Sequence, residues 1–513
     1  MKPGKLLLLL FLVGTWLGGC STVEVARTPS MALTSKAAET TYLGNWAGQA
    51  TKEHQGLSGV QLLSDGPRAF ALRAALAEHA QQTLDVQTYI LENDRSGRAL
   101  LKRMLHAAER GVRLRLLLDD TASLGKQRLL AAFNSHPNIQ VRVFNPVTAG
   151  RHSPPLYYLA LATDFDRKHR RMHNKLWVTD GSVAITGGRN LANRYFEVAD
   201  KLNFNDLDVL AIGPVVNALS GSFDRFWNHP MAVPLHYFEQ AATTAWRELL
   251  VELSDDARQG NALSSQPTAR RLAGEPAQSL LKSLVWTQAI ALWDPPEKLE
   301  AEGYPALEMT LLDQLRDAFH QVEHRLLIIS PYIVPTQASL DYLQSLRERD
   351  VTLTILTNAL EATDLPVLHG AYAPRRSTLL ANGVRLFELQ AKPSEETVQR
   401  GKGEITSLHT KAIAFDDERV FIGSLNADPR SVWWNSEVGL LIDSPVLGEK
   451  LWALAKQGTA PGRSYEVLLR DDGHLHWRTE VDGRLVILEE EPGSTWRHLK
   501  AWMLEVLGIE HLL

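Results

Sequence analysis

The pattern of hydrophobic and polar residues predicts alternating helices and strands in the first half of the chain. Apolar positions recur with helical spacing over residues 70–81 and 97–110, whereas short apolar runs at 84–90, 112–118 and 141–144 are typical of buried strands. Alternation of strand and helix favours βαβ units. We therefore expect an α/β fold with mixed, largely parallel sheets flanked by helices.

The second half of the chain repeats this order of elements. Strands are expected there at 325–333, 351–356 and 384–387, and helices at 337–349 and through 379–380. Short sequences also return, because ERGV at 109–112 echoes ERDV at 348–351, and VRVF at 141–144 echoes VRLF at 384–387. The duplication predicts two pseudo-symmetric domains of similar architecture.

The repeat and the composition of the segments around it divide the chain into six parts. We expect a signal peptide at 1–19 and a flexible linker at 20–55, followed by a first domain at 56–245. A second linker is expected at 246–285, a second domain at 286–455 and a C-terminal extension at 456–513. The extension lies outside the repeat. Its pattern predicts a short β segment and a terminal helix.

Composition and charge exclude some classes of function. The 513 residues suffice for two or three domains, and 44% hydrophobic with 22% charged residues is ordinary for a folded soluble protein. The formal net charge of -5 is a poor match to the basic surface that nucleic-acid binding requires. We therefore expect no nucleic-acid partner.

The N-terminus predicts a lipoprotein signal. Lys2 and Lys5 precede an apolar run at 6–13, and the small residues Gly18-Gly19 come directly before Cys20, the single cysteine of the chain. The alternative is an ordinary secretory signal that happens to contain a cysteine. Lipidation at Cys20 would anchor the protein in the cell envelope. Ser21 is not the aspartate that resembles an inner-membrane retention signal, so we expect the outer membrane, facing the periplasm.

One motif occurs twice in the chain at matching spacing. His173, Lys175 and Asp180 form His-x-Lys-x4-Asp, and the motif returns 236 positions later (409 − 173) as His409, Lys411 and Asp416. Each copy then reaches a pair of small residues and an asparagine, namely Gly187-Gly188 and Asn190, and Gly423-Ser424 and Asn426. The agreement indicates one active site at the interface of two matching halves.

Two histidines and two lysines suit the chemistry of a phosphodiester. If each His-x-Lys lies on a strand, His173 and Lys175 point to one face, as do His409 and Lys411. The lysines would hold the non-bridging oxygens, while one histidine attacks phosphorus and the other protonates the leaving alcohol. Neither a metal ion nor a cofactor is required.

The other motif residues have different expected roles. We interpret Asp180 and Asp416 as structural, since four residues separate each from its lysine. Asn190 and Asn426 either bind phosphate oxygens or fix the loop that follows the second strand, and Ser424 is a further candidate for substrate binding.

Each catalytic histidine also needs an acidic partner that fixes its tautomer. Asp206 follows His173 by 33 residues, and Glu437 follows His409 by 28 residues. Asp208 competes with Asp206 for this role. The alternative for Glu437 and Asp206 is a surface acid.

From Gly59 onwards the chain resembles the phospholipase D superfamily, most closely bacterial cardiolipin synthases of the C type. The segments that carry the resemblance are RMHNK at 171–175, GGRN at 187–190, DLDV at 206–209, SLHTK at 407–411 and NADPRS at 426–431. The resemblance implies that His173 becomes the phosphohistidine and that His409 acts as acid and then as base. It also implies that Asp206 and Glu437 are the accessory acids.

The expected function is therefore that of a phosphatidyltransferase that uses a phosphatidyl-histidine. Phosphatidylglycerol and phosphatidylethanolamine are the expected substrates, and we expect a monomer. Hydrolysis of phospholipids is the alternative within the same chemistry. A periplasmic nuclease and a non-catalytic lipid-binding lipoprotein are further alternatives.

Overall fold

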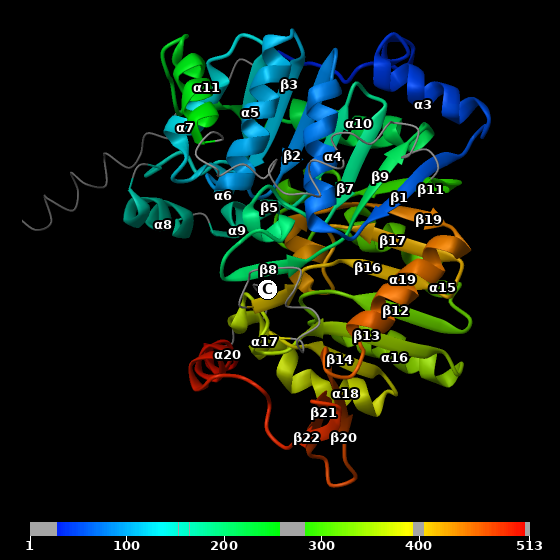
Figure 1. Ribbon diagram of the computed structural model, residues 1–513. Coiled ribbons are helices and arrows are strands. Elements are labelled where there is room, and N and C mark those ends of the chain that lie inside the picture. The colour runs from blue at the N-terminus through cyan, green and yellow to red at the C-terminus, as the bar shows by residue number, and fades with distance from the viewer. Residues whose placement is uncertain (1–27, 152, 164, 257–282, 393–404, 508–513) are drawn as a thin grey trace, which may run out of the picture.

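A computed structural model describes residues 28–151, 153–163, 165–256, 283–392 and 405–507 (Figure 1). The predicted signal peptide and Cys20 lie outside these ranges. No helix within them is both long enough and apolar enough to cross a bilayer.

Each half contains three parallel strands connected through helices, as the alternating pattern predicts. In the first half these elements are β2 (Thr83–Thr88), α5 (Arg95–Glu109), β3 (Arg113–Asp119), α7 (Gln127–Asn134) and β4 (Ile139–Phe144). In the second half they are β12 (Arg325–Ile329), α16 (Gln337–Glu348), β13 (Thr352–Asn358), α18 (Arg376–Ala381) and β14 (Arg385–Leu389). The helices present an apolar face to the sheet, for example Leu100, Leu101 and Met104 of α5.

Most of the other strands pair antiparallel, so the mixed sheets contain less parallel pairing than expected. Hairpins and returning strands extend the first half through β6 (Leu176–Thr179), β7 (Val183–Gly187), β9 (Asp208–Ile212) and β1 (Ser58–Leu63). The second half matches them with β16 (Ala412–Phe415), β17 (Arg419–Gly423), β19 (Val438–Asp443) and β11 (Val285–Trp293). A short turn can join only antiparallel neighbours.

The two halves are joined by strand pairing and by a hydrophobic cluster to which both contribute. Residues 285–287 of β11 pair with β1, and residues 288–293 pair with β19. Val178 and Val209 of the first half belong to the same buried cluster as Ala414 and Leu440 of the second. The interface between the halves is therefore a continuous core.

The predicted flexible linker at 20–55 is wrong for its described part. It contains helices α2 (Ser35–Ala38) and α3 (Tyr42–Lys52), and Thr41 caps α3 by accepting a hydrogen bond from the Gly44 backbone N–H at 3.0 Å. Leu43 and Ala47 are buried in the core of the first half. Polar composition concealed two capped helices whose few apolar residues face the core.

The C-terminal extension continues the sheet of the second half past residue 455. After α19 (Pro445–Gly458), strand β20 (Ser464–Leu469) pairs with β14, and β21 (Leu475–Val481) and β22 (Arg484–Leu488) follow in order. The predicted terminal helix is present as α20 (Thr495–Leu507), which packs on α17 (Pro366–Tyr372).

Candidate active site

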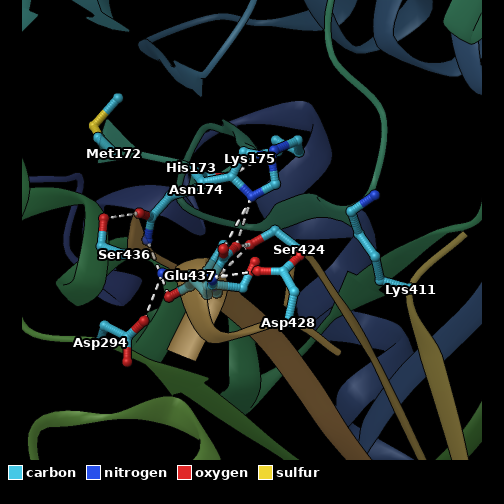
Figure 2. Close-up of polar contacts among 12 residues, drawn as sticks. Met172, His173, Asn174, Lys175, Asp294, Lys411, Ser424, Asp428, Ser436 and Glu437 are labelled. Atoms are coloured by element: carbon cyan, nitrogen blue, oxygen red, sulfur yellow. Dashed lines mark hydrogen bonds and ion pairs between the residues drawn. The ribbon is translucent and has the colours of Figure 1, made fainter. Parts of the chain in front are cut away.

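His173 lies between strand β5 (Arg171–Met172) and β6, in the connection rather than inside a strand as expected. Its backbone N–H donates to the Ser436 carbonyl at 2.9 Å, and its Nδ1 lies 2.8 Å from Glu437 Oε2 (Figure 2). Only 7% of the residue is exposed. Because Glu437 holds Nδ1, Nε2 is the ring atom that remains for chemistry.

His409 has the matching environment in the second half. It follows strand β15 (Ile405–Leu408), its backbone N–H donates to the Asn205 carbonyl at 2.8 Å, and its Nδ1 lies 2.6 Å from Asp206 Oδ2. The residue is 6% exposed. Both predicted histidines thus bind one of the two predicted acids through the same ring atom.

The acids are exchanged between the halves, which corrects the sequence expectation. Sequence distance paired His173 with Asp206 and His409 with Glu437, but each histidine binds the acid of the other half. The reason lies in two short parallel pairings, of β5 with β18 (Asn435–Ser436) and of β15 with β8 (Leu202–Asn205). Each acid directly follows one of these strands, so the pairing brings it to the opposite histidine.

The two lysines lie deep in the same centre. Lys175 Nζ donates to the His173 carbonyl at 2.6 Å, and Lys411 Nζ donates to the His409 carbonyl at 2.7 Å. Burial lowers the pKa of Lys175 to about 7 and that of Lys411 to about 8, although the acids Glu437 and Asp206 oppose this shift. An anionic substrate would restore the charged form of both lysines.

The histidines and their acids are shifted toward neutral forms. Burial, with the two lysines, lowers the pKa of His173 and His409 well below the ordinary value. Burial also raises the pKa of Glu437 to about 7 and that of Asp206 above its usual range. A neutral imidazole with its Nδ1–H held by an acid is the form that a nucleophile requires.

Two residues that were not predicted from the sequence form hydrogen bonds to the backbone beside the histidines. Asp119, the last residue of β3, accepts a hydrogen bond from the Met172 backbone N–H at 3.0 Å. Asn358, the last residue of β13, accepts one from the Leu408 backbone N–H at 2.7 Å. Their signal was available, since both end equivalent strands of the duplicated unit at an offset of 239 (358 − 119).

A buried ion pair that sequence reasoning also missed supports Glu437. Asp294 Oδ2 accepts from the Glu437 backbone N–H at 2.7 Å (Figure 2). It also accepts from Lys298 Nζ at 2.9 Å. Asp294 and Lys298 are fully buried, and burial raises the pKa of Asp294 to about 6. They follow β11, far from either motif, and no pattern in the sequence marks them.

Ser424 contacts an acid rather than an open site. Its hydroxyl donates to Glu437, whereas the equivalent position in the first half is Gly188. A Cβ at Gly188 would collide with Asp206 Oδ1, so the first half has no room for the hydroxyl. The two acids are therefore held differently.

The motif asparagines also differ from each other. Asn190 is fully buried, and its Oδ1 accepts from the Ile90 backbone N–H at 3.0 Å, which fixes the loop. Asn426 Oδ1 is buried without a hydrogen-bond partner among the described residues. Asp208, the competitor of Asp206, instead pairs with Arg73 at 2.9 Å.

Asp180 and Asp416 bind backbone, away from the histidines. Asp180 accepts from the N–H groups of residues 81–83, and Asp416 accepts from those of residues 323–325. Both residues adopt a left-handed conformation, with φ of 50° and 51°. Among the described residues, no group of three or more His, Cys, Asp or Glu side chains is placed to hold a metal ion.

Comparison with known proteins identifies relatives over most of the chain. A family model described as "Cardiolipin synthase, PLD-like domain" matches residues 74–227 and 315–457. The chain is 36% identical over 471 residues to "Cardiolipin synthase C" of Escherichia coli strain K12, which covers 90% of this chain and 97% of the relative. It is 24% identical over 394 residues to "Cardiolipin synthase" of Staphylococcus aureus strain Mu50, covering 76% of this chain and 65% of the relative.

Among solved structures, the phosphatidylserine synthase of Haemophilus influenzae Rd KW20 has a similar fold. The TM-score is 0.56 at 14% sequence identity, and the match covers 91% of this chain and 99% of the other. At this level of identity the similarity concerns the fold.

Proposed function

Because the chain belongs to the cardiolipin synthase family of phospholipase D-like proteins, we propose that it is a phosphatidyltransferase whose covalent intermediate forms on His173. The observation that carries the proposal is the exchange of acids. It gives each histidine a buried acid on Nδ1 and brings both histidines and both lysines into one centre.

The first step transfers the phosphatidyl group to the protein. His173 Nε2 attacks phosphorus, a P–N bond forms, and the P–O bond to the head-group alcohol breaks. His409, protonated once the anionic phosphate is bound, donates its proton to the leaving oxygen. Glu437 stabilises the positive charge that develops on His173, and Lys175 and Lys411 offset the charge on the non-bridging oxygens.

The second step passes the phosphatidyl group to an acceptor. The acceptor hydroxyl gives its proton to His409 while its oxygen attacks phosphorus, and the P–N bond breaks. His173 leaves with its electron pair and is neutral again, and the protonated His409 is ready for the next cycle. Asp206 holds His409 through Nδ1 during both proton transfers.

The proposed substrates are phosphatidylethanolamine or phosphatidylglycerol as donor and the primary hydroxyl of phosphatidylglycerol as acceptor. The name of the E. coli relative, cardiolipin synthase C, supports cardiolipin as the product. Transfer is favoured over hydrolysis by the family model and by the E. coli relative, both of which are described as cardiolipin synthases.

The membrane anchor is a separate part of the proposal. Lipidation of Cys20 would retain the protein at the periplasmic face of the outer membrane, and the basis is the N-terminal sequence alone. The full-length Cys20→Ser variant should then be released with the periplasmic fraction. Its retention in membranes would contradict the lipid anchor.

Thin-layer analysis of lipid products tests the proposed activity. Purified protein is incubated with phosphatidylglycerol and phosphatidylethanolamine, with the His173→Ala variant as control. New cardiolipin in the wild-type reaction supports transfer, whereas phosphatidic acid alone would support hydrolysis. Unchanged lipids together with cleavage of added DNA would refute action on phospholipid.

A further inference from the structure

Two helices next to the active site carry exposed apolar side chains. Helix α8 (Pro154–Ala162) contains no charged residue, and its Leu156 and Leu159 are 57% and 63% exposed. In α20, Trp496 and Trp502 are 62% and 54% exposed. With the neighbouring exposed residues Phe165 and Leu499, these side chains define the α8–α20 face.

Both helices are hydrogen-bonded to segments that border the catalytic centre. In α8, the Tyr157 hydroxyl donates to Asp120 at 2.9 Å, and the adjacent Asp119 holds the backbone of Met172 beside His173. In α20, Arg497 Nη1 donates to the Leu360 and Thr363 carbonyls at 2.9 and 2.7 Å. These segments, helix α6 (Asp120–Ser123) and the 360–363 loop, follow β3 and β13, which are equivalent strands of the duplicated unit.

The two helices of the α8–α20 face are therefore linked to opposite ends of the catalytic centre. The 360–363 loop follows Asn358, whose side chain holds the backbone of Leu408 beside His409. In Figure 1 both helices project from the left side of the molecule, α8 above β8 and α20 below it. One helix is thus linked to the His173 end of the centre and the other to the His409 end.

Cationic side chains accompany the exposed apolar residues. Arg167 is exposed and follows α8 closely, and Lys500 Nζ lies 5.3 Å from the ring centroid of Trp496. Aromatic and aliphatic side chains beside lysine and arginine are the combination that inserts at the interface of an anionic bilayer. The net charge of the whole chain is -5, so these cations are opposite in sign to the charge of the protein as a whole.

We propose that the α8–α20 face docks on the surface of a phospholipid bilayer and places the active site over the lipid head groups. This inference rests on the proposed function, because a phospholipid substrate resides in a bilayer and the catalytic histidines are buried. Insertion of the leucine and tryptophan side chains into the acyl region supplies the binding energy.

Sedimentation with vesicles of phosphatidylglycerol and phosphatidylcholine tests the docking surface. The full chain carries Cys20→Ser throughout, so that no lipid anchor contributes. Two paired variants, Leu156→Gln with Leu159→Gln and Trp496→Gln with Trp502→Gln, alter the face. The matched control, Leu485→Gln with Ile487→Gln, alters β22, where these residues are 68% and 53% exposed.

Each paired variant of the face should bind vesicles about tenfold more weakly or worse, while the control binds as the parent does. Turnover of monomeric dihexanoyl phosphatidylglycerol should stay unchanged in all of them. Equal vesicle binding by all variants, or equal loss in the control, would overturn the docking surface. So would sedimentation equilibrium showing a dimer of the parent that the face variants disrupt. Absence of turnover of monomeric lipid by the parent would instead refute the proposed function.

Discussion

His173 in the first half and Glu437 in the second are joined by a 2.8 Å contact between Nδ1 and Oε2, across the boundary of the duplicated units. The contact makes the acid of one half a positioning group for the histidine of the other. Since Asp206 and His409 form the reverse pair, each half is incomplete without its counterpart.

Exchange of the acids can be tested by removing each one separately. Glu437→Gln should slow formation of the phospho-enzyme about 10²-fold or more, because His173 loses the group that stabilises its charged form. Asp206→Asn should act on the steps that need His409. Single-turnover measurements with a labelled phosphodiester whose leaving group needs no proton separate these effects, because formation then requires His173 but not His409. A formation rate lowered by Asp206→Asn but not by Glu437→Gln would contradict the assigned pairs.

The unequal roles of the histidines predict different kinetics with a p-nitrophenyl phosphodiester, whose leaving group needs no proton. His409→Ala should still release a burst of nitrophenolate, since His173 can attack, and then turn over about 10²-fold or more slowly without its general base. His173→Ala should give no burst. A burst from the His173 variant, with none from the His409 variant, would reverse the assignment.

The lysines predict a loss of activity at alkaline pH. The pKa of buried Lys175 is about 7 and that of Lys411 about 8, so kcat/KM of the free protein should fall as pH rises through this range. Lys175→Arg retains its charge and should move the decline toward pH 8. An unchanged pH profile would exclude Lys175 as its origin.

Burial of the lysines should also make the stability of the fold depend on pH, but stability should rise with pH where activity falls. Both folded-state pKa values lie below the ordinary lysine value, so above pH 7 the unfolded chain binds more protons than the folded one. The resulting penalty on stability shrinks as pH rises toward that ordinary value.

Asp416 should matter for stability rather than for catalysis. Burial alone would raise the pKa of its carboxyl, but backbone N–H groups of Arg325, Glu323 and His324 outweigh burial and lower it. Its contribution to stability should thus be present above the ordinary Asp value and lost as pH falls through the folded-state pKa. Asp416→Ala should cost about 1–3 kcal/mol in denaturant unfolding. A loss of activity without a loss of stability would show a catalytic role.

Much of the architecture could be predicted from local sequence patterns. Apolar periodicity locates the parallel strands and their helices, and the repeated motif identifies His173 and His409, because these signals depend on neighbours within one element. The apolar runs after each His-x-Lys indicate strands, but strands of only four or five residues are too short to show that they pair antiparallel with their neighbours.

Contacts between distant segments could not be read from spacing. Glu437 reaches His173 only because β18 pairs with β5, a pairing of two residues on each side that leaves no periodic pattern. The buried ion pair between Lys298 and Asp294 could not be predicted from the sequence either, because its burial depends on the residues that surround it in the folded protein. Asp119 and Asn358 were visible in principle, as equivalent positions of the repeat.

The parallel pairings β5–β18 and β8–β15 have a further consequence for how the protein can change. In a symmetric assembly of two identical subunits, every substitution enters both ends of the active site at once. Here one chain supplies both ends, so Ser424 can contact Glu437 while Gly188, which has no side chain, lets Asp206 lie directly against its backbone. Covalent linkage also makes assembly of the centre independent of dilution. Because both copies of the motif lie in one chain, each copy can acquire its own substitutions and its own role in the reaction.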